Sequence, residues 1–193
     1  MRAQIELVVR LARRFAENRR GAAAVEFALI LPFLLLLFLG SIEASSLLTV
    51  DRRVNVISGT VGDLVARWDP TAGPLPGTTL TDYFQASEGI LTPYSTTGLE
   101  QVVSLVEVAA NGTTKVLWSR APSGGTARVT DSAYTLPPET NQLARDVGCI
   151  VVSETRYSYK PVLGLVFTEA LSLYNESYYL PRFAECIDPP SAG

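Results

Sequence analysis

A long apolar run near the N-terminus constrains the fold of this chain more than any other feature. Residues 22–42 read AAAVEFALILPFLLLLFLGSI and contain one charged side chain, that of Glu26. About 20 apolar residues are enough for a helix to cross the hydrocarbon core of a bilayer. The run therefore predicts a single transmembrane helix, to which the rest of the 193-residue chain is attached.

Charge is divided unevenly around this run. Residues 1–20 carry six arginines against two glutamates, whereas residues 21–193 carry ten basic and 17 acidic side chains. Because Lys and Arg are enriched on the cytoplasmic side of membrane spans, the N-terminus should be cytoplasmic and the body periplasmic. An acidic body with its basic residues gathered ahead of the span is not typical of nucleic-acid-binding proteins. We therefore predict no nucleic-acid partner.

Histidine and cysteine content argues against catalysis and metal binding. The chain has no histidine and two cysteines, Cys149 and Cys186. A Ser-His-Asp triad and an HExxH zinc site are therefore impossible, and two cysteines cannot form a four-cysteine zinc site. The Ser, Asp and Lys residues show no spacing that suggests a nucleophile with its base. We expect no enzymatic activity, no catalytic residues, no metal ion and no cofactor.

The helix is predicted to continue beyond the membrane. After residue 42, apolar residues recur at alternating spacings of three and four, which is typical of a helix packed along another helix. This packing stripe consists of Leu47, Val50, Val54, Ile57, Val61, Leu64 and Trp68. Asp69-Pro70 ends the pattern, so one helix should span residues 22–68, about 70 Å at 1.5 Å per residue. The stripe could pack against the chain's own head, against helices of neighbouring molecules, or against both.

The remainder, residues 69–193, predicts a small α+β head. A linker rich in Pro and Gly covers residues 69–79, and a helix is expected at residues 80–91 with Thr81 as its N-cap. A second short helix and four strands follow, the first two strands joined by a tight turn at Asn111-Gly112. The helix is expected at residues 139–145 and the strands at residues 101–110, 113–120, 147–159 and 171–183. The expected fold class is α+β: a long N-terminal transmembrane helix and a small antiparallel sheet with short helices.

Both cysteines fall in the part of the chain that is predicted to be periplasmic, which is an oxidising compartment. We expect Cys149 and Cys186 to form a disulfide that closes a loop of about 38 residues and contributes on the order of 4 kcal/mol. Two free thiols or an intermolecular bond are the alternatives.

The junction before the apolar run has the layout of a prepilin-type leader, in which a basic segment ends in a glycine that precedes the cleaved bond. Here Arg19-Arg20-Gly21 is followed by Ala22, and Glu26 is then the fifth residue of the mature chain. Cleavage would create an α-ammonium on Ala22, four residues before Glu26 and on the same helix face. Since a carboxylate in hydrocarbon costs roughly 2.5–3.5 kcal/mol, Glu26 should pair with this ammonium or with that of a neighbouring molecule.

Two other interpretations of this segment remain. It could be an uncleaved signal-anchor in which Glu26 is incidental. It could also be a cleavable secretory signal cut after Ala44-Ser45-Ser46, although its apolar region is long for that role.

The stretch RGAAAVEFALILP, residues 20–32, resembles the N-terminal motif of TadE-like proteins, pseudopilins of the tight-adherence (Flp-type) pilus system. The resemblance implies a leader over residues 1–21, cleavage after Gly21 by a prepilin peptidase, and a minor pilin that acts in pilus assembly. It also implies an inner-membrane location, possible incorporation in the pilus, and three kinds of further partner: the major Flp pilin, other pseudopilins and the inner-membrane assembly platform. The alternative function is a membrane-anchored periplasmic binding or adhesion module.

Overall fold

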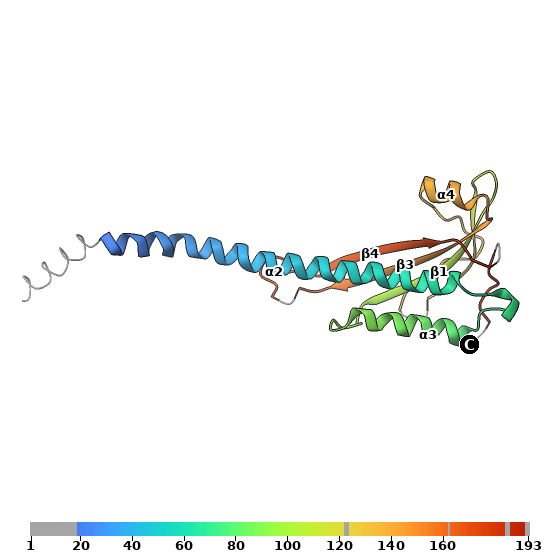
Figure 1. Ribbon diagram of the computed structural model, residues 1–193, viewed down its shortest axis with the longest axis horizontal. Coiled ribbons are helices and arrows are strands. Elements are labelled where there is room, and N and C mark those ends of the chain that lie inside the picture. The colour runs from blue at the N-terminus through green and yellow to red at the C-terminus, as the bar shows by residue number, and fades with distance from the viewer. Residues whose placement is uncertain (1–18, 122–123, 162, 184–185, 192–193) are drawn as a thin grey trace, which may run out of the picture. The chain divides into compact units, whose positions relative to one another are not determined.

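The computed structural model describes residues 19–121, 124–161, 163–183 and 186–191 (Figure 1). The predicted leader therefore lies almost wholly outside the described residues. The chain divides into an N-terminal unit that ends at Ser45 and a second unit that begins at Ser46 and contains the head. The head combines a four-stranded antiparallel sheet with short helices, so the predicted α+β class is confirmed.

The helix predicted for residues 22–68 is present as α2, Arg19–Ala66, and continues through Pro32. It ends two residues before the predicted boundary because the chain turns at Trp68. The Trp68 backbone N–H donates to the carbonyl of Val65 (3.0 Å), and its indole N–H donates to the carbonyl of Gly73 (2.9 Å). A 3-10 turn, η1 (Pro70–Ala72), then begins with Asp69 as its N-cap.

The next helix starts earlier than predicted. Helix α3 spans Gly77–Glu88 and is followed by a 3-10 turn, η2 (Gly89–Leu91). The Thr81 hydroxyl donates to the carbonyl of Gly77 (2.9 Å) from inside the helix, so the prediction of Thr81 as the N-cap is wrong. The earlier start places Leu80 in the second turn, where its side chain is buried in the core.

The sheet has the strand order β2-β1-β3-β4, with every neighbouring pair antiparallel. Its strands are β1 (Leu99–Val108), β2 (Thr114–Arg120), β3 (Cys149–Tyr159) and β4 (Leu171–Tyr179), and the short helix α4 (Pro138–Ala144) precedes β3. The predicted tight turn joins β1 to β2, with Gly112 at a φ of 85° that favours glycine. Strand β4 ends at Tyr179, before the predicted residue 183, because Pro181 cannot donate a ladder hydrogen bond.

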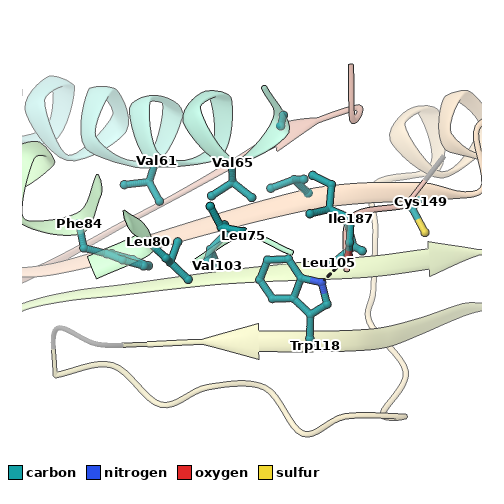
Figure 2. Packing of buried hydrophobic residues seen from close by; sticks show 12 residues of the cluster. Val61, Val65, Leu75, Leu80, Phe84, Val103, Leu105, Trp118, Cys149 and Ile187 are labelled. Carbon is teal, nitrogen blue, oxygen red and sulfur yellow. Dashed lines mark hydrogen bonds between the residues drawn. The ribbon is translucent and has the colours of Figure 1, made fainter. Parts of the chain in front are cut away.

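Each face of the sheet is covered. Helices α2 and α3 pack on one face, where Val65, Phe84 and Val103 belong to one buried cluster (Figure 2). In the same cluster, the Trp118 indole N–H donates to the backbone carbonyl of Ile187 (2.8 Å). The segment before α4 covers part of the opposite face, where Tyr134 packs in a second cluster. The head therefore has three layers, with the sheet in the middle.

Strand β3 runs antiparallel to the part of α2 that packs on the head. Val50 of α2 and Tyr159 at the end of β3 belong to one buried cluster. Val65, near the end of α2, and Cys149, at the start of β3, belong to another. The end of the head at which α2 enters is therefore the end at which β3 finishes and β4 begins.

Candidate functional site

The first part of α2 is long and apolar enough to cross a membrane, and none of the residues in its most apolar part is buried. Exposed side chains in this part include Phe27, Phe33 and Phe38, of which Phe33 is 72% exposed. A soluble protein rarely leaves such a surface in water. The helix is therefore compatible with a single-pass membrane anchor.

The predicted cleavage junction lies at the start of the described helix. Gly21 and Ala22 are in helical conformation and exposed, as is Glu26. A Cβ added to Gly21 would meet no other atom within 4 Å, and its backbone φ is not one that requires glycine. Neither packing nor backbone geometry within the described chain explains a glycine at this position. A requirement for glycine here would therefore have to come from another molecule.

The predicted packing stripe faces the chain's own sheet over most of its length. Val50, Val54, Ile57 and Val61 are completely or almost completely buried, whereas Leu47, Leu64 and Trp68 are half-buried. Toward the end of the helix the buried position moves to Val65 because an α-helix has 3.6 residues per turn, and a strict 3.5-residue stripe drifts around it. Of the two packing alternatives, contact with the head accounts for the four buried positions.

Small residues let α2 approach the sheet closely. The Ser58 hydroxyl donates to the carbonyl of Ser153 on β3 (2.6 Å) and lies 3.1 Å from the hydroxyl of Ser177 on β4. A Cβ added to Gly62 would lie 2.7 Å from the ring of Tyr179 and 3.2 Å from the Cβ of Ser153. A larger side chain at position 62 would therefore push the helix away from the sheet.

Cys149 and Cys186 form a disulfide, with their Cα atoms 5.3 Å apart. The bond joins the buried start of β3 to the C-terminal segment. Nearby in the chain, Ile187 is buried in the core and accepts the hydrogen bond from Trp118. The bond thus holds the C-terminal segment, whose described residues form no strand or helix, against the face of the sheet that α2 covers.

Replacement of Cys186 by serine is expected to lower the free energy of unfolding by about 2–4 kcal/mol, because the unfolded chain regains the freedom of a 37-residue loop. Denaturant titration of the full chain in detergent, monitored by tryptophan fluorescence, measures the change. Reduction of the wild-type protein should produce the same loss, and it should not change the Cys186→Ser variant. An unchanged midpoint on reduction of the wild type would contradict the prediction.

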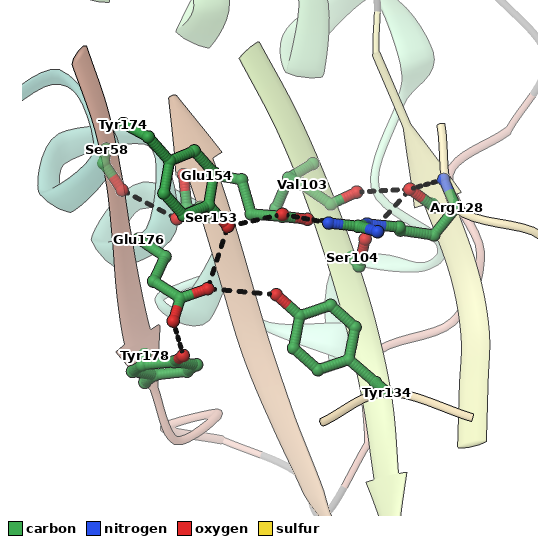
Figure 3. A network of polar contacts seen from close by, with 11 residues as sticks. Ser58, Val103, Ser104, Arg128, Tyr134, Ser153, Glu154, Tyr174, Glu176 and Tyr178 are labelled. Atoms are coloured by element: carbon green, nitrogen blue, oxygen red, sulfur yellow. Dashed lines mark hydrogen bonds and ion pairs between the residues drawn. The ribbon is translucent and has the colours of Figure 1, made fainter. Parts of the chain in front are cut away.

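A network of carboxylates and tyrosines occupies the sheet face opposite α2 (Figure 3). Glu154 is 4% exposed and accepts two hydrogen bonds from the Arg128 guanidinium, one of them from Nε at 3.0 Å. The hydroxyl of Tyr174 lies 2.8 Å from Glu154 and 2.9 Å from Glu176. Tyr134 and Tyr178 also donate to Glu176. Two carboxylates that face each other on neighbouring strands are thus held by one cation and three hydroxyls.

Burial raises the pKa of the Tyr174 hydroxyl, and the adjacent Glu154 and Glu176 carboxylates raise it further. The pKa values of Tyr134 and Tyr178 are raised by the same causes. All three hydroxyls therefore keep their protons at any physiological pH and remain donors to the carboxylates. This arrangement stabilises the sheet, because each hydroxyl donates a hydrogen bond to a carboxylate on the same face.

Replacement of Arg128 by alanine is expected to lower the free energy of unfolding by roughly 1.5–3 kcal/mol, because a buried carboxylate loses its charged partner. Arg156→Ala is the matched control, since Arg156 is exposed and lies over the Tyr174 ring at 5.5 Å. That contact is worth about 0.5–1 kcal/mol. Denaturant titration of both variants measures the difference, and equal losses would contradict a special role for the Arg128–Glu154 pair.

Residues 21–56 match the family model described as TadE-like protein. This segment is similar to TadE-like proteins. The match confirms, over these residues, the resemblance read from the motif. No curated protein and no solved structure matches the chain.

The TadE-like segment contains the predicted cleavage junction, Glu26, the apolar run and the first part of the packing stripe up to Val54. It thus joins the part of α2 suited to a membrane with the part that packs on the head. Ser58 and Gly62, which lie farther along α2, are outside the matched segment.

Sequence analysis missed several structural residues outside the TadE-like segment. Ser58, Gly59 and Gly62 lie beside the stripe of large apolar residues, and such a group of small residues is a signal for close approach of the helix. The Arg128–Glu154 pair gave no comparable signal, because Arg128 lies in a loop 26 residues from its partner. Within the described part of the chain, no group of three or more Cys, Asp or Glu side chains could hold a metal ion.

Proposed function

We propose that this protein is a minor pilin, or pseudopilin, that acts in assembly of a tight-adherence pilus. The observation that carries the proposal is the match of residues 21–56 to the TadE-like family, since this segment holds both the junction and the apolar helix. A prepilin peptidase removes residues 1–21, and the mature chain begins at Ala22. The head contributes a stable folded body.

The geometry of α2 supports the proposal in two ways. Its exposed apolar part needs a bilayer or the helices of other pilins around it, and one carboxylate, Glu26, lies within that surface. Its later part is packed on the head, so the two functions of the helix are separated along its length. The major Flp pilin, other pseudopilins and the inner-membrane platform are the partners that the exposed part would meet.

Topology follows from the charge distribution. The arginines of residues 1–20 precede the span, which supports a cytoplasmic N-terminus and a periplasmic head. The disulfide between Cys149 and Cys186 supports this orientation, because the periplasm is oxidising. The protein is then a single-pass inner-membrane protein before it joins any assembly.

The mass of the mature protein tests the proposal. The chain purified from membranes of cells that carry a prepilin peptidase should begin at Ala22, and the chain from cells without the peptidase should retain residues 1–21. Deletion of the gene should abolish or strongly reduce piliation. A mature chain that begins at Met1, or at Leu47 as in a secreted protein, would contradict the proposal.

The alternative of a membrane-anchored binding module has one observation in its favour. A groove of about 410 Å³ lies on the sheet face opposite α2, lined by Arg128, Glu154, Arg156 and Tyr174 among others. Arg128 and Glu154 are already paired with each other and Arg156 lies over the Tyr174 ring, so these three charged groups are less available to recognise a ligand. Normal piliation in the deletion strain would favour this alternative.

A further inference from the structure

We propose that the loop between β3 and β4 inserts its apolar side chains into the surface of the bilayer, next to the transmembrane helix. The inference rests on the proposed membrane anchoring and goes beyond it. It assigns a second membrane contact to the head, made by residues 163–167. We call this segment the membrane loop.

The membrane loop exposes an unusual amount of apolar surface. It reads LGLVF, and the exposed fractions are 46% for Leu163, 61% for Leu165 and 46% for Val166. The nearest charged residues are Lys160 before it and Glu169 after it. Single exposed apolar residues are common on soluble proteins, but several adjacent ones in one loop indicate a surface that contacts protein or lipid.

The membrane loop lies at the end of the head where α2 enters. Tyr159, the last residue of β3, pairs with Leu171, the first residue of β4, so the loop extends beyond this edge of the sheet. Tyr159 also packs in the same cluster as Val50, close to the start of the head. Helix α4 is at the opposite end of the head (Figure 1).

Chain connectivity holds this end of the head near the membrane. The apolar run ends at Ile42, and Leu47 already packs in the cluster that contains Tyr159. Five residues span about 18 Å when fully extended and about 7.5 Å as a helix. Even the extended value, which is an upper bound, keeps Leu47 within about 18 Å of Ile42 and so of the hydrocarbon core. The end of the head that carries the membrane loop packs around Leu47, and the headgroup layer occupies part of that distance.

The chemistry of the loop matches the interface of a bilayer. Apolar side chains that lie in an interface enter about 5–10 Å into the boundary between headgroups and acyl chains. Lys160 is exposed at the start of the loop, where its ammonium can reach lipid phosphates while its stem stays in the apolar layer. Glu169 follows the last apolar residue and can remain in water. Lipid is favoured over a protein partner because the anchor itself brings this end of the head to the bilayer.

Depth-dependent quenching tests the inference in the full chain. A single cysteine is placed at Leu165, labelled with an environment-sensitive fluorophore, and the protein is reconstituted at one copy per lipid nanodisc. The native cysteines are joined to each other and do not react. We expect a blue-shifted emission that loses most of its intensity when brominated lipids replace ordinary ones.

Two further label positions make the outcomes distinguishable. Leu143→Cys is the matched control, because Leu143 is 63% exposed on α4 at the far end of the head and should show neither the shift nor the quenching. Leu36→Cys reports the span itself and should be strongly quenched. Quenching at position 36 without quenching at 165 would overturn the membrane loop and leave the anchor intact. Absence of quenching at both positions would overturn the anchor as well.

A second copy of the chain is the competing partner for the same surface. If the blue shift at position 165 appeared only in discs that hold several copies, and brominated lipids did not quench it, the loop would be a contact between subunits. That result would overturn the proposed lipid contact.

Discussion

Replacement of Gly21 by leucine is expected to leave the protein in the membrane with its leader still attached. The peptidase site must accommodate the residue that precedes the cleaved bond, and glycine presents no side chain there. Among the described residues, a Cβ added at position 21 meets no atom within 4 Å. The substitution should therefore change processing without destabilising the fold. An immunoblot of membrane fractions, with intact-mass measurement, follows the leader.

The control for this variant is Ala28→Leu, which adds the same kind of side chain to an exposed position of α2 farther from the junction. It should be processed like the wild type. Loss of processing in both variants would indicate that insertion of the helix has failed. Normal cleavage of the Gly21→Leu variant would show that Gly21-Ala22 is not the processed bond.

The sequence was most informative where one physical requirement decides the structure. An apolar run of transmembrane length can hardly be anything but a helix, and Asn111-Gly112 between two β-rich segments requires a tight turn. The stripe through Val50, Val54 and Ile57 identified the face of α2 that is buried. These features depend on local spacing, which is visible in one sequence.

Features that depend on contacts between distant residues could not be read in the same way. The start of α3 is set by burial of Leu80 against the sheet, and the capping preference of Thr81 is too weak to compete with that burial. The partner of Glu154 is an arginine in a loop that has no periodic pattern. The disulfide was predictable because the chain has only two cysteines and both lie in the part that is predicted to be periplasmic, where thiols are oxidised.

The features of the candidate site that depend on residues close together in the chain were predictable. Gly21, Ala22 and Glu26 form a compact motif whose spacing can be interpreted from the chain alone. The direction in which the stripe packs needed the structure, because the same spacing suits a contact with the head and a contact with another helix. The exposure of Leu165 likewise needed the structure, because only the pairing of β3 with β4 shows that this residue lies in the loop between them.

Replacement of Glu26 by alanine is expected to give a mature, stable, membrane-located protein in cells with few or no pili. Insertion should not suffer, because the substitution makes the span more apolar. Cleavage should continue, because the processed bond lies between Gly21 and Ala22. Assembly should fail, because the α-ammonium of Ala22 loses its carboxylate in a medium of low dielectric constant. Loss of one partner of a fully buried pair costs about 3–5 kcal/mol, and less where water reaches the charge near the headgroups.

Glu26→Gln separates charge from shape in this prediction. The amide keeps the size and hydrogen-bonding reach of the carboxylate but cannot neutralise an ammonium, so piliation should be nearly as poor as with alanine. Phe27→Leu is the matched control, since it alters the adjacent exposed side chain and keeps the charge. Electron microscopy of pili, with immunoblots that verify equal amounts of mature protein, compares the three variants. Normal piliation in both Glu26 variants would make the glutamate incidental and favour the membrane-anchored binding module, because pairing with the α-ammonium is the reason for a charge at this depth.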